Sequence, residues 1–369
     1  VGLRSKVVNE VGVNYQDEVY GDVTMLAVRM RATAGLGIAA RERLQVNCTR
    51  VFDGQDSWNP AVIIADIFTN KTYGMRRDAS ELDLTDLEET GTRFSVSDVE
   101  FNGSFAQKGT GYEAMQNVAG LVAGKVVQEG SLTTVVLDRL QTVRTAFFTS
   151  ANILQDTLQI NYTFDPAGDT DGVQIEWRDP QFFKQQYVTW PTSAENPEKF
   201  TLFGCTDEDY ATVYAQYLWN TIALRRKRIR FQTEAEGLLP RFGDRIGVSH
   251  PLAEWGQSGV VVTVIDGTTL RLDQPLNWVD GKTHAMLLRN EWGKESNLYT
   301  VSKGPAPNQI VVTNGTTAEV YVAGDGLEPT HYAFGPTDEF VTVWIVEKIV
   351  PQGGNIVQVE AQKYDDKIF

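Results

Sequence analysis

The sequence predicts an α+β chain that is mainly β, a multidomain protein with β-barrel-like domains and a few helices. Most of its apolar residues alternate with polar ones, which is the pattern of half-buried strands. Dipeptides typical of hairpin turns recur in the last third of the chain, at Asp266-Gly267, Asp280-Gly281 and Asn314-Gly315. Only a few stretches have the apolar spacing of a helix. The length of 369 residues allows about two or three domains.

The composition excludes several classes of protein. Hydrophobic residues make up 42% of the chain, which is enough to build packed cores, so disorder is not expected. The formal net charge of -15 argues against a general binder of DNA or RNA, because binding to phosphates needs a basic face. No apolar run approaches the ~18 residues that span a bilayer, so no membrane segment is expected. The chain starts at Val1 rather than Met and lacks a signal peptide, which suggests an excised or processed fragment.

The N-terminal part, residues 1–58, is expected to be β, because two alternating runs at 23–32 and 43–52 predict strands. A helix-containing α+β middle domain is expected at 59–190. Asn59 can cap its first helix, Pro60 fits the first turn, and Gly74 is expected to end that helix. The other elements expected here are helices at 78–91 and 110–130 and strands at 132–138, 158–164 and 172–180.

Residues 191–250 are expected to hold a linker, a long helix and barrel strands. The linker, at 190–200, is rich in proline and polar residues and should be exposed. Thr206 can cap the helix, which has acidic residues at its positive end and a basic cluster at its negative end. Residues 228–232 alternate as on a strand, and residues 237–248 predict a strand, a turn and a return strand.

The last part of the chain is expected to be almost entirely β. Residues 251–336, which contain the turn dipeptides, predict an inserted β-hairpin subdomain. Residues 337–369 predict two closing barrel strands around Gly353-Gly354. Because terminal strands need partners, we expect residues 340–346 to form a sheet with residues 228–248.

No motif for a cofactor, a metal or catalysis meets its structural requirements. The spacing of Gly35, Gly37 and Ala40 matches a dinucleotide fingerprint, but a strand follows where that fingerprint needs a helix. A calcium-type loop with Gly172 at its sixth position would begin at Ala167, which cannot bind a cation. Three scattered histidines and the cysteines Cys48 and Cys205 lack metal-ligand spacing, and the cysteines are expected to be buried thiols. We therefore predict no catalytic, cofactor-binding or metal residues.

The basic run after the long helix is a candidate for subunit contact rather than a grip on nucleic acid. Arg226, Arg228 and Arg230 alternate along the predicted strand, and an acidic face of a neighbouring copy could lie opposite them. The alternative is two solvated faces, since exposed ion pairs contribute only ~0–1 kcal/mol each. The acidic candidates are Glu81, Asp83, Asp86, Glu88 and Glu89.

Two other functions stay open from the residues alone. A cell-wall glycoside hydrolase would need two converging carboxylates about 5–9.5 Å apart, and no spacing in the sequence selects such a pair. A receptor- or carbohydrate-binding module would need exposed aromatic residues on the late hairpins. The candidates are Trp255, Trp278, Tyr299 and Tyr321, which could equally be core or subunit contacts.

Several stretches resemble the central tail-tip, or host-specificity, protein J family of long-tailed bacteriophages. The matching stretches lie at 63–75, 111–124, 171–180, 203–248, 259–276 and 346–369, and the stretch at 203–248 is the most specific. The family motifs place structural residues at Tyr73, Gly74, Trp177, Asp179, Pro180, Phe203, Gly204, Cys205, Pro240, Gly243 and Asp244. Where this chain has Pro240, Gly243 and Asp244, the family often has a tight Pro-Gly-Asp turn, and the turn of this chain is longer.

The resemblance implies a structural baseplate hub and not an enzyme. Three copies would form a ring that closes the tail tube and contacts the distal tail protein, the tape-measure protein and tail-tip accessory proteins. DNA would pass through this ring without specific binding, and the acidic net charge of the chain fits such passage. The protein would be assembled in the host cytoplasm and reside in the virion. The resemblance also implies that an N-terminal segment and a C-terminal receptor-binding extension are missing from this chain.

Overall fold

Strands are the commonest regular element in the computed structural model, which describes residues 58–85, 87, 99–105, 108–163, 170–182, 184–251, 256–315, 320–337 and 340–369. The strands expected at 23–32 and 43–52, Cys48 and the glycine motif at 35–40 lie outside these residues. The described strands form two three-stranded sheets, a six-stranded sheet and a closed six-stranded barrel. The predicted class, α+β and mainly β, is confirmed. The domain boundaries stay a prediction.

Helix α2 (Pro60–Thr69) begins as the sequence predicts. Asn59 caps it by accepting a hydrogen bond from the backbone N–H of Ala61 at 2.8 Å, and Pro60 occupies the first position. The expected end at Gly74 is wrong, because the helix already ends before its cap, Asn70. Gly74 instead lies where the chain turns back onto α2: a Cβ at this position would be 2.5 Å from the backbone oxygen of Ile67.

Two further helix predictions differ from the elements that form. The helix predicted at 78–91 does not start at 78: Ala79–Glu81 is a short 3₁₀ turn, η1, and Leu82–Asp83 is a strand, β1. Thr85 and Leu87 are helical, and the other residues from 86 to 91 lie outside the described residues. The helix predicted at 110–130 is α4 (Gly111–Leu121), which begins at a capping box made by Thr110 and Glu113. Most of the remaining stretch is strand β2 (Gly124–Glu129), because its backbone pairs antiparallel with residues 132–137.

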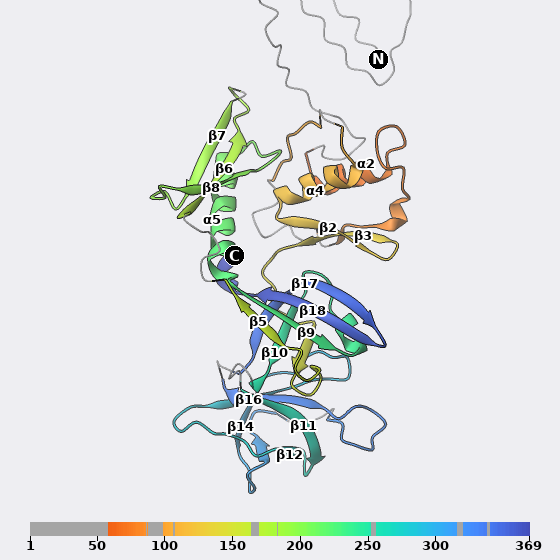
Figure 1. Cartoon of the computed structure of the whole chain (residues 1–369), viewed down its shortest axis with the longest axis vertical. Helices are drawn as coiled ribbons and strands as arrows, with labels where there is room; N and C mark the ends of the chain where they lie inside the picture. Colours follow the sequence, from red (N-terminus) through yellow and green to blue (C-terminus); the bar gives the residue numbers. More distant parts are fainter. Residues whose placement is uncertain are drawn as a thin grey trace, which may run out of the picture. The chain divides into compact units, whose positions relative to one another are not determined.

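The first three-stranded sheet has the order β1-β3-β2, where β3 spans Leu132–Leu137. Strand β1 runs parallel to β3, and β2 runs antiparallel to it. Helices α2 and α4 pack on each other, and α4 packs on β2 (Figure 1). Met115 and Val118 of α4 are fully buried against Val126 and Val135 of the sheet, in one apolar core.

The second three-stranded sheet has the order β7-β6-β8 and packs against the longest helix. Its strands are β6 (Gly172–Arg178), β7 (Gln185–Trp190) and β8 (Pro197–Thr201), and the helix is α5 (Glu208–Leu224) (Figure 1). The linker predicted at 190–200 is largely exposed, but it does not separate two domains. It joins β7 to β8, which pairs in parallel with β6.

The cap of α5 lies one residue later than predicted. Asp207, and not Thr206, accepts the hydrogen bond of the third helical N–H, that of Tyr210, at 2.7 Å. Thr206 instead accepts a hydrogen bond from the side chain of Asn102 at 3.0 Å. The helix ends at Leu224, so the basic cluster lies beyond its last turn.

The six-stranded sheet has the order β4-β10-β17-β18-β9-β5. The predicted pairing of residues 340–346 with the 228–248 stretch is confirmed, since Thr342–Ile345 pair with Arg245–Val248. Of the strand, turn and return strand predicted at 237–248, the return strand forms as β10, but the first strand is wrong, because residues 235–238 form a 3₁₀ helix, η3. Strands β17 and β18 lie between β10 and β9 in the sheet. The strands are β4 (Ala146–Thr149), β5 (Gln159–Tyr162), β9 (Lys227–Thr233), β10 (Arg245–Ser249), β17 (Thr342–Gly353) and β18 (Ile356–Lys363), followed by η5 (Asp366–Ile368).

The closed barrel lies between β10 and β17 in the sequence and has the order β11-β12-β15-β14-β13-β16. The hairpin predicted at Asp266-Gly267 forms between β11 and β12. The hairpins predicted at Asp280-Gly281 and Asn314-Gly315 are wrong, because the strands on either side of each turn pair with other strands. The barrel strands are β11 (Gln257–Val264), β12 (Thr269–Leu272), β13 (His284–Leu288), β14 (Tyr299–Lys303), β15 (Gln309–Val312) and β16 (His331–Pro336).

Two of the candidate binding aromatics pack against the core of this barrel. The Trp278 ring lies 4.8 Å from that of Phe334, and Tyr299 packs against the same cluster. These contacts favour a structural role for both. Trp255 lies outside the described residues. No helix in the described part of the chain is long and apolar enough to cross a membrane.

Candidate functional site

A buried ion pair lies where residues 203–248, the most specific family stretch, contact three segments that are distant in the sequence. Arg225, the residue that caps the C-terminus of α5, donates two hydrogen bonds to the carboxylate of Asp138, at 2.6 and 2.7 Å. Asp138 directly follows β3. Only 6% of the Arg225 side chain and 17% of the Asp138 side chain are exposed. The hydroxyl of Tyr217 also donates to Asp138, so the end of α5 is tied to the end of β3.

Asp138 stabilises the charged form of Arg225. Burial disfavours its charged form, but the hydrogen bonds and the negative charge of Asp138 outweigh burial and raise the pKa of the guanidinium above its usual value. A bidentate pair of this kind fixes the orientation of both groups as well as their charge. The ion pair therefore holds the end of α5 against the end of β3 and is not a reactive acid or base.

A cluster of aromatic rings extends the tie to the C-terminal residues. The ring of Phe369 lies 6.3 Å from that of Tyr217 and 5.9 Å from that of Tyr364. The Arg245 guanidinium lies over the Tyr364 ring, 4.8 Å from its centroid. Tyr364 accepts a hydrogen bond from the backbone N–H of Gln141 at 2.7 Å. The segment after β3 is thus held to β10 and to the end of the chain.

The turn at Pro240–Asp244 completes this region, which we call the joint and define by Asp138, Gln141, Arg225, Gly243 and Tyr364. The Gly243 carbonyl accepts a hydrogen bond from the Gln141 side chain at 2.8 Å, and its N–H donates to the Val346 carbonyl at 2.9 Å. Gly243 has φ +81°, and a Cβ there would lie 2.4 Å from Cγ1 of Val136. The longer turn of this chain therefore still requires glycine at this position.

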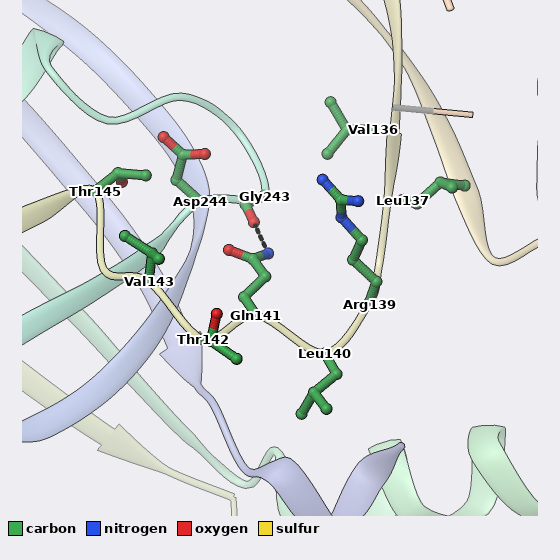
Figure 2. Close-up of a pocket in the computed structure, with 10 residues that line it drawn as sticks. All are labelled: Val136, Leu137, Arg139, Leu140, Gln141, Thr142, Val143, Thr145, Gly243 and Asp244. Atoms are coloured by element: carbon green, nitrogen blue, oxygen red, sulfur yellow. Dashed lines mark hydrogen bonds between the residues drawn. The ribbon is translucent and has the colours of Figure 1, made fainter. Parts of the chain in front are cut away.

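Two hollows flank this turn. One has a volume of about 410 Å³ and the other of about 320 Å³, and Val136, Leu137 and Gly243 line both. Figure 2 shows the larger hollow, with Gln141 bonded to Gly243 and Leu140 pointing away from that glycine. Asp244 is the only carboxylate that lines the larger hollow. The smaller hollow is lined by two carboxylates, and each already pairs with an arginine: Asp138 with Arg225 and Glu347 with Arg228.

The other family-motif residues lie in two places. At the end of β6, the Arg178 N–H donates to the Cys205 carbonyl, and Asp179 closes the following turn, which contains Pro180, by accepting from the N–H of Gln181 at 2.7 Å. Gly204 has φ +85°, and its face lies against the ring of Phe101. Trp177 and Cys205 are buried, and Phe203 packs on Phe101. Tyr73 and Gly74 lie apart from these, beside α2, where the Tyr73 hydroxyl donates to Asp66.

Cys205 provides a direct test of this packing. The thiol is 2% exposed, and burial raises its pKa to about 11. In the Cys48→Ser variant, we expect iodoacetamide at pH 8 to label the native Cys205 thiol at least ~100-fold more slowly than the denatured thiol. Mass spectrometry over time measures both rates. Equal rates would contradict the buried position.

The raised pKa of the Cys205 thiol also predicts that the free energy of unfolding falls at alkaline pH. Since the folded pKa lies above the unfolded value of 9.0, the contribution of the protonated thiol is complete below that pH. It is lost as the pH rises from about 9 to about 11. Denaturant titrations of the Cys205→Ala variant should lack this component of the pH dependence.

Two of the three arginines proposed for subunit contact have side-chain partners within the chain. Arg228 pairs with Glu347 at 3.3 Å, and Arg230 lies 3.8 Å from Glu360. Both arginine side chains stay more than half exposed, at 63% and 51%. The backbone carbonyl of Arg226 accepts a hydrogen bond from Thr163.

The acidic candidates are only partly described. Glu81 pairs with Arg77 of the same segment at 3.5 Å, and Asp83 accepts from the N–H of Thr85. Asp86, Glu88 and Glu89 lie outside the described residues. The proposed contact between these acids and the β9 arginines stays a prediction.

Sequence reasoning missed Asp138, Gln141, Tyr364 and Phe369. Asp138 lies 87 positions from Arg225, and no local pattern around it marks a partner. Within the described ranges, no three His, Cys, Asp or Glu side chains gather in a group that could hold a metal ion.

Comparison with known proteins gives one match at the level of sequence. No family model matches the chain. The chain is 22% identical over 316 residues to the tip attachment protein J of Escherichia phage SECphi27, a match that covers 79% of this chain and 25% of that protein. The chain thus spans about a quarter of the length of this relative.

Three solved structures have low overall similarity. The tail protein from Neisseria meningitidis MC58 is 10% identical, with a TM-score of 0.32 over 70% of this chain and 56% of that one. A chain of the native gene transfer agent virion is 10% identical, with a TM-score of 0.38 over 74% and 46%. The 43 kDa tail protein of prophage MuSo2 from Shewanella oneidensis is 11% identical, with a TM-score of 0.31 over 68% and 61%.

The sequence match indicates a phage tail protein as the class that this chain resembles. The resemblance to the tip attachment protein J family, indicated first by the sequence motifs, is confirmed by the match over most of the chain.

Proposed function

We propose that this chain is a structural hub of a bacteriophage tail tip, in which three copies form a ring that closes the tail tube. The observation that carries the proposal is the match to a tip attachment protein along 79% of the chain. The joint supports a structural role, because its charged groups are held in a bidentate ion pair and its turn in backbone hydrogen bonds. Such ties suit a part that must keep its geometry under load.

The hub would connect the tail tube to the parts that attach to the host. Its partners would be the distal tail protein, the tape-measure protein and tail-tip accessory proteins, and the DNA would pass through the ring. The net charge of -15 supports passage without binding, because a protein that neutralises few phosphates releases few counterions. The protein would be assembled in the host cytoplasm and remain in the virion.

The arginine side of β9 is the proposed half of the contact between copies. Arg228 and Arg230 are largely exposed, and their partners within the chain are surface pairs worth only ~0–1 kcal/mol each. An acidic face of the next copy, with Glu81, Asp83 and the acids that follow, could therefore replace or extend these pairs at little cost. A ring needs such a heterologous contact, in which two different surfaces meet.

Light scattering tests the ring directly. We expect a concentration-dependent species of about 123 kDa, three times the chain mass of 41.1 kDa. Added salt should favour this trimer at first, because salt screens the repulsion between the acidic copies. The Debye length, beyond which charges are largely screened, is about 10 Å at 0.1 M. The double variant Arg228→Glu, Arg230→Glu should shift the mass toward that of one chain.

The matched control is Arg271→Glu on β12, whose side chain bonds only to Thr263 of the same hairpin among the contacts described. This variant should keep the trimer. A stable species at twice the chain mass would contradict a threefold ring.

A further inference from the structure

His331 lies in a buried chain of hydrogen bonds between the closed barrel and the six-stranded sheet. It belongs to β16 of the barrel, and only 3% of the residue is exposed. Its Nε2 lies 2.9 Å from a carboxylate oxygen of Glu328, and its Nδ1 lies 3.2 Å from the hydroxyl of Thr149, a residue of β4 in the sheet. Both ring nitrogens therefore have a partner, and the two partners come from different segments of the chain.

The two partners select one form of the ring. An ionised carboxylate can only accept, so Nε2 carries a proton and donates to Glu328. The Thr149 hydroxyl can then donate to an unprotonated Nδ1, while its oxygen accepts from the backbone N–H of Ala151 at 3.3 Å. A proton on Nδ1 would force this fully buried hydroxyl to accept instead and to find a new acceptor for its own proton. The hydrogen bonds therefore favour a neutral ring.

The charged groups that face the ring do not overcome this preference. Glu328 is 56% exposed, and its other oxygen already accepts from Arg289 at 3.1 Å. The guanidinium of Arg289, only 10% exposed, also donates to Glu236 of η3 at 3.0 Å. Both nearby carboxylates are thus shared with one buried arginine. Burial of the ring, with the positive charge of Arg289, holds the pKa of His331 below its usual value against the opposite effect of the two carboxylates.

We propose that this network is a pH-sensitive contact between the barrel and the sheet, in which His331 is neutral and a second proton on its ring breaks the hydrogen bond from Thr149. Acid weakens the contact at this one place, whereas the apolar cores of the barrel and of the sheet contain no group that titrates with it. This inference is independent of the proposed tail role.

The contribution of the neutral ring to the free energy of unfolding changes with pH in one direction. The folded chain resists protonation of His331, whereas the unfolded chain takes up the proton near pH 6.5. The contribution is therefore complete above about pH 6.5 and is lost as the pH falls through the lowered pKa of the folded state. Ordinary carboxyl groups titrate near about pH 4, so a fall from about pH 7 to about pH 5 reports mainly histidines.

Urea unfolding of the full chain at about pH 7 and about pH 5 tests the contact. His250→Gln serves as the parent, because burial also lowers the pKa of His250 and its titration would add to the change. In this parent, the urea midpoint should fall between the two pH values, and adding His331→Asn should remove at least about half of that fall. The raised pKa of Glu295 affects parent and variant alike and cancels from the comparison.

Glu328→Gln is the second variant, which is needed if His331→Asn fails to fold. The amide oxygen can still accept from Nε2, but the negative charge that favours protonation is gone, so the fall in the midpoint should move to lower pH. Nitrogen-15 NMR of the unsubstituted chain at about pH 8 should show a proton on Nε2 of His331 and none on Nδ1. A proton on Nδ1 would overturn the proposal. An equal fall in the parent and in His331→Asn would also overturn it, as would an unmoved fall in Glu328→Gln.

Discussion

The Asp138→Asn variant should lose about 3 kcal/mol of unfolding free energy, because it leaves the guanidinium of Arg225 buried without its charged partner. The side chain keeps its size, so the loss reports charge and hydrogen bonding rather than packing. Tyr217 also loses the carboxylate to which its hydroxyl donates. Urea unfolding followed by tryptophan fluorescence measures the change, with the slope of the transition checked for two-state behaviour.

Glu347→Gln is the matched control for this variant. It removes the carboxylate partner of Arg228, but that arginine is 63% exposed, and the expected loss is only about 0–1 kcal/mol. If Asp138→Asn is as mild as Glu347→Gln, the joint does not depend on the ion pair. Asp138→Asn together with Arg225→Met should recover part of the lost stability, because no unpaired charge is then buried.

The Gly243→Val variant should destabilise the chain by about 2–5 kcal/mol, through two separate effects. A β-branched residue at φ +81° costs about 1–2 kcal/mol in backbone strain. The added side chain also overlaps Val136, whose Cγ1 lies 2.4 Å from the Cβ position, and overpacking costs about 1–3 kcal/mol. Thermal unfolding measured by circular dichroism should show the loss as a lower midpoint.

A second substitution separates the two effects. Val136→Ala in the Gly243→Ala background should remove the overlap and leave only the backbone strain, so the double variant should be more stable than additivity predicts. Gly267→Ala is the control glycine, because nothing lies within 4 Å of its Cβ position, and it should change stability little. Equal effects at Gly243 and Gly267 would contradict the tight contact at the joint.

Local signals in the sequence predicted the start of α2 and the buried side of β9. Asn59 and Pro60 are sufficient to begin a helix, because capping involves only the first turn. The alternation of Ile229 and Phe231 with Arg228 and Arg230 correctly predicted which side of β9 is buried. These features depend on neighbours within a few residues, and a single sequence contains that information.

Apart from the end of α2 and the cap of α5, the errors concern contacts that are distant along the chain. The stretch after α4 has residues that a helix tolerates, but pairing with β3 converts it into β2. The turn dipeptides at 280–281 and 314–315 form turns, yet their flanking strands find other partners during barrel closure. The joint could not be predicted for the same reason, since Asp138, Gln141 and Tyr364 meet only after the sheets have formed.

The central claim is that this chain is a structural component of the phage tail tip. Electron microscopy of intact particles labelled with antibody against this chain tests the claim most directly. The account predicts label at the distal end of the tail and, in averaged images, threefold density there. Label on the capsid, along the tail shaft or only on released host-cell material would contradict it.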